Sequence, residues 1–188
     1  MAELKDYNCE FNPHIKLEDF SKDYLIKMMH AWSSAYLRMA ELCNQAVKEK
    51  FGAEEALKCE LAAYQKVADT TVPKIAKAAG IEVNDILDVI KVLQLCPDGP
   101  LAGVYEAEYD IKDRSHVVIT ITRCRTLDFC EKYAPDRVKT ICHDIDVPIN
   151  DAYVRALLPG GRLLPVRIPD KPRKDPREIP CVWEFRKE

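Results

Sequence analysis

The chain has 188 residues, a length typical of one domain. With 47% hydrophobic and 31% charged residues, it has the composition of an ordinary globular protein that folds without disulfide staples. Its formal net charge of -3 provides no basic field for a phosphate backbone, so we expect no nucleic-acid partner.

The cysteines and the apolar runs together indicate a cellular compartment. Residues 1–6 include acidic side chains and no apolar run, so they do not resemble a secretory signal. No stretch approaches the ~20 apolar residues of a membrane helix, and we expect no membrane partner. We therefore predict a cytoplasmic protein in which the eight cysteines are free thiols rather than a disulfide framework.

The first half of the chain has the periodicity of amphipathic helices. A long helix is predicted over residues 21–50, with Ser21 as its N-cap and Gly52 at its end. A second runs to about residue 79 with Gly80 after it, and Pro73 should kink or split it. A third begins at Asn84 or Asp85 and ends before the turn at 96–100.

The second half alternates short strands with short helices. Residues 104–109 and 116–122 are predicted to form a β-hairpin, and residues 162–168 and 181–185 two further strands. Short helices are predicted at 127–133, 136–142 and 148–157.

These elements predict an α+β fold in which a helical N-terminal half packs on a small antiparallel sheet, with a cysteine-bearing C-terminal half. We expect a single domain over residues 1–188. It comprises an N-terminal arm at 1–20, a helical part at 21–96, and a part with the sheet and the cysteine site at 101–188.

Three cysteines are candidates for a common site. If the strand that ends at Cys124 lies beside the strand that begins near Cys181, their thiols meet at one end of the sheet, and Cys142 can approach from the intervening helix. Cys124, Cys142 and Cys181 would suit zinc or iron, because thiolate is a soft ligand. The chain has no Cys-x-x-Cys motif that would support a metal site. The alternative is that these cysteines are buried as small apolar residues. Whether Cys130 joins the site is left open.

A nucleophilic cysteine is the other chemical interpretation. Cys142 stands next to His143 and Asp144, which makes these three the candidate catalytic residues. Adjacent residues rarely face the same way, so adjacency alone establishes no contact between sulfur and imidazole. Asp146, shortly before Pro148, is more typical of a helix cap.

The apolar stripe of the first helix includes Trp32, Tyr36 and Met39. Such a stripe can line a ligand cavity, but core packing is the favoured interpretation for each of them. Cys43 and Cys59 lie in the predicted helices and are also expected to be packing residues.

Several short motifs resemble those of a family of uncharacterised cytosolic proteins of anaerobic bacteria and archaea, itself distantly similar to L-2-amino-thiazoline-4-carboxylic acid hydrolases. The motifs are Phe51-Gly52-Ala53-Glu54-Glu55-Ala56, Arg123-Cys124, Cys142-His143, Ile168-Pro169-Asp170-Lys171-Pro172 and Cys181-Val182-Trp183-Glu184-Phe185. The resemblance maps the shared cysteines of the family onto Cys124, Cys142 and Cys181. It also implies a further cysteine before the proline-rich segment, which residues 164–168 lack, and this departure puts a four-thiolate site in doubt.

The resemblance implies a hydrolase that opens a cyclic C–N bond of a small amidine-like acid, by metal-bound hydroxide or by a thiolate. The alternative is a non-catalytic accessory or sensor protein that binds a metal or a small ligand. A small-molecule ligand is the expected partner under both readings. A homo-oligomer is compatible with the sequence, and a role of the long first helix in protein interaction is a third reading.

Overall fold

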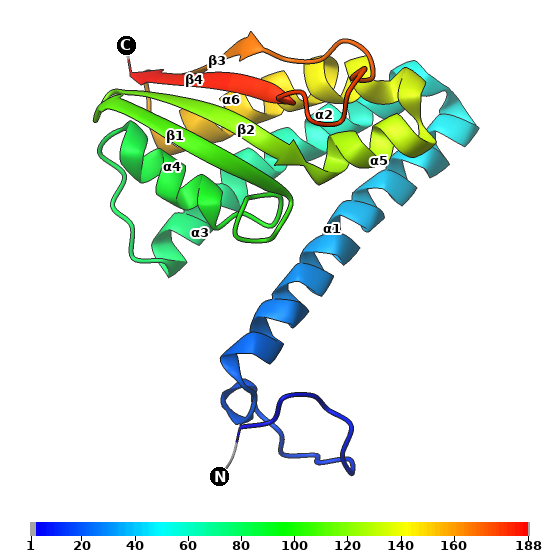
Figure 1. Cartoon of the computed structure of the whole chain (residues 1–188), viewed down its shortest axis with the longest axis vertical. Coiled ribbons are helices and arrows are strands. Elements are labelled where there is room, and N and C mark those ends of the chain that lie inside the picture. The colour runs from blue at the N-terminus through cyan, green and yellow to red at the C-terminus, as the bar shows by residue number, and fades with distance from the viewer. Residues whose placement is uncertain (1–2, 188) are drawn as a thin grey trace.

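The computed structural model describes residues 3–187; the first two residues of the predicted arm and residue 188 lie outside this range. It is an α+β fold, as predicted (Figure 1). Its helices are η1 (Leu17–Asp19), α1 (Lys22–Phe51), α2 (Ala53–Thr70), α3 (Val72–Ala78), α4 (Ile86–Gln94), α5 (Arg125–Tyr133), η2 (Pro135–Arg137), η3 (Thr140–Ile145) and α6 (Asp146–Leu157). Its strands are β1 (Tyr105–Asp113), β2 (His116–Cys124), β3 (Gly161–Arg167) and β4 (Cys181–Lys187).

Local capping signals determine where the N-terminal helices begin and end. The Ser21 side chain accepts a hydrogen bond from the backbone N–H of Tyr24, and Gly52 ends α1 with a φ of 92° that favours glycine. The second predicted helix divides into α2 and α3 at Thr71, just before Pro73. Asp85 caps α4 through hydrogen bonds from the N–H groups of residues 87 and 88.

The sheet is antiparallel in the order β1-β2-β4-β3. The predicted hairpin is β1 and β2, and the last strand, β4, lies in the interior of the sheet beside β2. Ile121 stands opposite Cys181 in this pair, so the predicted neighbourhood of the two strands is confirmed. Residues predicted to form one short helix at 136–142 instead contribute to η2 and to a π-helical turn, η3.

Helices α4 and α6 cover one face of the sheet. Val89 of α4 and Val154 of α6 are fully buried against Val117 of β2 and Phe185 of β4. A second apolar cluster joins α2, α3, α4 and α6, with Tyr153 of α6 almost fully buried within it. These two clusters anchor α6, and with it the π-helical turn that precedes it.

The expectation that the α1 stripe and two helical cysteines are core residues is wrong. Trp32 is 56% exposed and Met39 63% exposed, while Tyr36 is half-buried. Cys43 and Cys59 are also exposed. The physical reason for the stripe is that α1 extends past the body of the protein and contacts it with its other face, so the stripe lies toward solvent (Figure 1). Within residues 3–187, every helix is too short or too polar to cross a membrane.

Candidate functional site

Two of the predicted thiols meet at one end of the sheet. Cys124 ends β2 opposite Tyr105, and Cys181 begins β4 beside β2. The Cys124 sulfur accepts a hydrogen bond from the N–H of Leu127 at 3.4 Å and thereby caps α5. The Trp183 indole N–H donates to the Cys181 sulfur at 3.1 Å. Both sulfurs are therefore held in place by specific donors.

The third predicted thiol lies on the π-helical turn. Cys142 is buried, and the next residue, His143, is half-buried with its Nε2 atom enclosed. This Nε2 has no hydrogen-bond partner in the described part of the chain. Asp144, the third predicted catalytic residue, is exposed to solvent. Turns of π-helix are rare and occur frequently at functional sites.

The predicted thiols share one neighbourhood. Burial raises the pKa of the Cys142 thiol, and the nearby Asp146, Cys124, Cys181 and Cys130 raise it further. Because such electrostatic influence declines with distance, these groups lie near one another. Burial likewise raises the pKa of Cys124 and of Cys130 to about 11, and that of Cys181 to about 12. All four thiols are protonated at neutral pH, which makes them poor nucleophiles.

The arrangement does not fit a metal centre. Across residues 3–187, no group of three or more His, Cys, Asp or Glu side chains is placed to hold an ion. The zinc or iron site predicted from Cys124, Cys142 and Cys181 therefore has no support in the ligand geometry, although the three thiols are neighbours.

Three acidic residues, which we call the acid cluster, lie near one another: Glu60 of α2, Asp98 of the turn after α4, and Asp146 at the start of α6. Burial, together with the nearby Asp98 and Glu60, raises the pKa of Asp146 to about 7. Burial also raises the pKa of Asp98 and that of Glu60. Asp146 also acts on the thiols, since it contributes to the raised pKa values of Cys124, Cys142 and Cys181.

Tyrosine hydroxyls surround the acid cluster. Tyr153 of α6 donates a hydrogen bond to Asp98 Oδ2 at 3.5 Å, and its own pKa is raised by burial and by Asp98. Burial raises the pKa of Tyr36 to about 12 and also raises those of Tyr64 and Tyr105. The four phenols are therefore neutral, and their hydroxyl groups can donate hydrogen bonds to a carboxylate or to a ligand.

The acid cluster is desolvated. Glu60, Asp98 and Asp146 are half-buried residues. Enough protein surrounds each carboxyl group for burial to be the main cause of its raised pKa. Desolvated carboxyl groups that lie together are candidates for a functional site.

The acid cluster was not predicted from the sequence. Asp146 resembled a helix cap, and Asp98 lies in a Pro-Asp-Gly-Pro turn that is typical of exposed loops. The helix pattern contained one indication of a buried polar site. Glu60 and Tyr64 are four residues apart and share the face of α2 that carries Leu57 and Leu61. Polar residues that interrupt an apolar face indicate a buried polar site.

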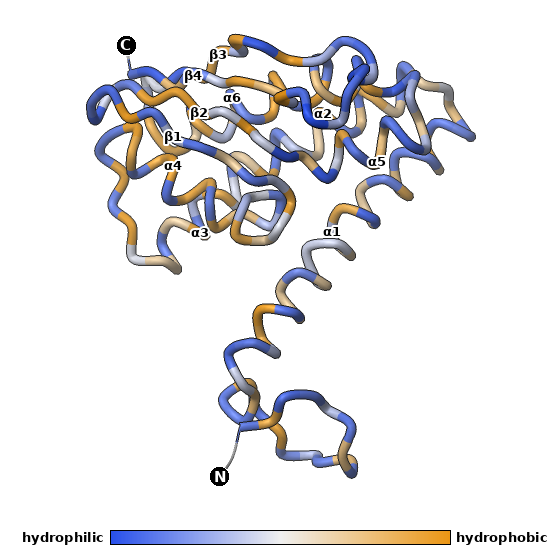
Figure 2. Tube along the Cα trace, in the orientation of Figure 1, coloured by the Kyte–Doolittle hydropathy of each residue, from blue (hydrophilic) through white to orange (hydrophobic). Residues whose placement is uncertain are grey.

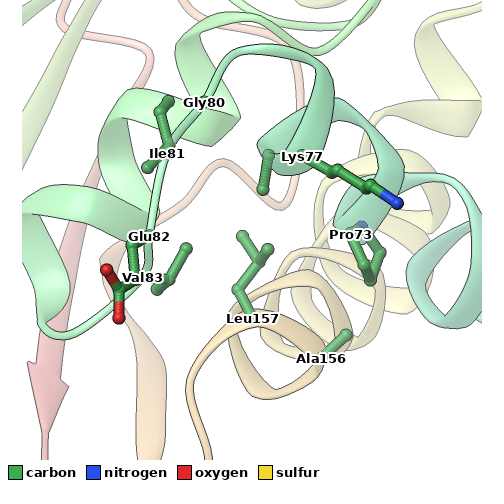
Figure 3. Close-up of a pocket in the computed structure, with 9 residues that line it drawn as sticks. Pro73, Lys77, Gly80, Ile81, Glu82, Val83, Ala156 and Leu157 are labelled. Carbon is green, nitrogen blue, oxygen red and sulfur yellow. The ribbon is translucent and has the colours of Figure 1, made fainter.

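A surface depression lies elsewhere, between α3, the loop after it and α6 (Figure 3). It has a volume of about 550 Å³, and Leu157 points into it. Its lining is mainly apolar, with Lys77 and Glu82 as its charged residues. The depression contains none of the thiols or acidic residues described above, so it offers no comparable chemistry.

We found no protein-family model, no curated protein and no solved structure similar to this chain. The resemblance to the thiazoline hydrolases therefore stays a prediction.

Proposed function

We propose that the protein is a small-molecule hydrolase that opens a C–N bond of a cyclic amidine-type compound, with Asp146 as the general acid and base. The observation that carries the proposal is the grouping of Asp146 with Asp98 and Glu60, where burial and these two neighbours raise its pKa to about 7. A catalytic acid or base works best when its pKa lies near the operating pH.

The reaction balances without a metal or an external cofactor. The ionised Asp146 carboxylate accepts a proton from a water molecule as the water oxygen forms a bond to the amidine carbon. The carboxylic acid then returns this proton to the ring nitrogen as the C–N bond breaks, and the hydroxyl proton left on the carbon passes through solvent to the released amine as the carbonyl forms. The enzyme ends in the ionisation state in which it began, and the product contains one added water.

The charge of the acid cluster favours a basic substrate. Glu60, Asp98 and Asp146 lie near one another, and each carboxylate that ionises attracts a cation. One opposing charge is Arg137, which lowers the pKa of Glu60 but is itself paired with Glu41. An amidine is basic and carries parallel N–H donors, so it complements a carboxylate in charge and in geometry.

The remaining groups suit binding and orientation. His143 Nε2 is enclosed without a partner among the described residues, and a ligand that reaches it would satisfy it. The protonated thiols Cys124 and Cys181 supply a weakly polar surface rather than an attacking group.

The experiment uses the purified full chain, a chelator, and L-2-amino-thiazoline-4-carboxylic acid as the probe. Mass spectrometry should detect addition of one water, and Asp146→Asn should lower the rate by about 100-fold or more. Asp136→Asn, an exposed carboxyl on η2, is the matched control and should retain the rate. Comparison with Asp144→Asn identifies which acid acts. Turnover that survives in Asp146→Asn would refute the proposed role of Asp146.

A non-catalytic ligand-binding role is the second candidate, because thiols and phenols that stay neutral form a polar lining without a nucleophile. Calorimetric titration separates the two. Binding of the probe without any hydrolysis product would support the binding protein and would exclude the hydrolase for that compound.

A further inference from the structure

Helix α1 carries a second apolar face that the body of the protein does not use. Seven residues recur at alternating spacings of three and four, the pattern of a coiled-coil seam. We call them the α1 seam: Leu25, Met28, Trp32, Ala35, Met39, Leu42 and Ala46. They contain no charged residue, whereas 31% of the chain is charged.

The α1 seam is open to solvent over its last five residues, whereas Leu25 and Met28 are half-buried. Trp32, Met39 and Leu42 are 56%, 63% and 43% exposed, and Ala35 and Ala46 are exposed as well. A surface helix of a folded chain normally turns such a stripe toward the core. Exposed large apolar side chains in a continuous row mark an interaction surface.

The opposite face of α1 is the one that contacts the body. Ser33 is buried and donates a hydrogen bond to the Pro97 carbonyl, and Asn44 donates to Glu60. Figure 1 shows that α1 runs past the body toward its N-terminus, and Figure 2 shows apolar residues along the projecting part. The seam is therefore not the packing face of the monomer.

We propose that the α1 seam pairs with the α1 seam of a second copy of this chain, with the two helices antiparallel about a twofold axis. The side-chain sizes are self-complementary in this arrangement. In one register Ala35 lies opposite Met39 of the other copy, Ala46 opposite Met28, and Trp32 opposite Leu42. Each small residue thus faces a large one, which allows close packing without voids.

The position of the body favours the antiparallel direction. The body packs on the C-terminal part of α1, where Glu41 pairs with Arg137 and Asn44 with Glu60. Parallel helices would bring both bodies to the same end. Antiparallel helices place the projecting half of each α1 along the C-terminal half of the other, so both overhangs become covered.

The area of the seam is sufficient for a dimer of moderate affinity. At 1.5 Å per residue, positions 25–46 span about 33 Å, and half the circumference of a helix is about 17 Å. Pairing then covers on the order of 560 Å² on each chain and 1,100 Å² in total, at the lower limit of specific interfaces. We therefore expect a dimer that dissociates in the micromolar range.

Sedimentation equilibrium on the full chain tests this, with a reductant present because Cys43 and Cys59 are exposed and could cross-link. The average mass should rise toward twice that of one chain as concentration increases. Trp32→Glu should remain at the monomer mass, and Val166→Glu, which adds the same charge at an apolar β3 residue that is 60% exposed, should dimerise normally. A monomeric wild type, or a Trp32→Glu protein that still dimerises, would overturn the proposal.

A second measurement does not depend on how well Trp32→Glu folds. The chain has two tryptophans, and Trp183 is buried, so Trp183→Phe leaves Trp32 as the single reporter. Quenching of Trp32 by iodide should weaken severalfold between dilute and concentrated protein. Quenching that is independent of concentration, in a sample whose circular dichroism shows intact helices, would mean that the seam stays uncovered.

Discussion

Replacement of Asp146 by Asn should change how the stability of the protein depends on pH. The pKa of Asp146 is about 7 in the folded chain against an ordinary value of 3.8, because burial and the nearby Asp98 and Glu60 oppose its charge. Between these two values the unfolded chain has lost a proton that the folded chain retains. Stability therefore falls as pH rises through this window.

The magnitude follows from the size of the shift. The pKa of Asp146 differs by about three units between the folded and unfolded chain, and each unit corresponds to ~1.4 kcal/mol. The free energy of unfolding should therefore be about 4 kcal/mol lower at pH values above 7 than at values below 3.8. From pH 5 to pH 8 the destabilisation due to Asp146 should grow by about 2.5 kcal/mol. Asn has no charge to desolvate, so Asp146→Asn lacks this part of the loss.

Urea unfolding of both proteins at pH 5, 6, 7 and 8 measures the effect. The free energy of unfolding of the variant minus that of the wild type should rise by about 2.5 kcal/mol across the series. Asp136→Asn, an exposed carboxyl, should show no such rise. A difference that stays constant within about 0.5 kcal/mol would show that Asp146 ionises normally, and the proposed general base would then lose its basis.

Three further predictions concern other features of the fold. Cys181, whose pKa is about 12, should react with iodoacetamide at neutral pH at least ~100-fold more slowly than the exposed Cys59, and equal rates would contradict its burial. Arg173→Lys should lower the free energy of unfolding in urea by about 1–3 kcal/mol, because the nearly buried guanidinium donates hydrogen bonds to Glu131 from two nitrogens. Unchanged stability would show that a single ammonium group is enough to hold Glu131. Asp85→Ala should lower it by about 1 kcal/mol through loss of the α4 cap, whereas a variant as stable as the wild type would mean that water replaces the cap.

The sequence predicted those features that depend on neighbouring residues. The cap at Ser21, the end of α1 at Gly52 and the break before Pro73 are each determined within a few positions. The meeting of Cys124 with Cys181 was also predictable, because the alternation in the strands predicted a sheet in which both lie at strand ends.

Features that depend on tertiary packing were not predictable in this way. Trp32 and Met39 follow the same periodicity whether a helix face packs on its own core or on another chain, so the pattern could not distinguish burial from exposure. Asp98 and Asp146 have side chains that normally lie in water, and only the packing of α1, α2 and α6 around them raises their pKa values.

The place of β4 in the sheet has a consequence for the order of folding. β4 is the last element of the described chain, yet it lies between β2 and β3 and supplies Cys181 to the site. Until it inserts, β2 and β3 have no shared neighbour, and Trp183 and Phe185 are missing from the main core. Pairings that join distant parts of a chain form slowly. During synthesis the helices can therefore form early, whereas the sheet and the site must wait for the final strand.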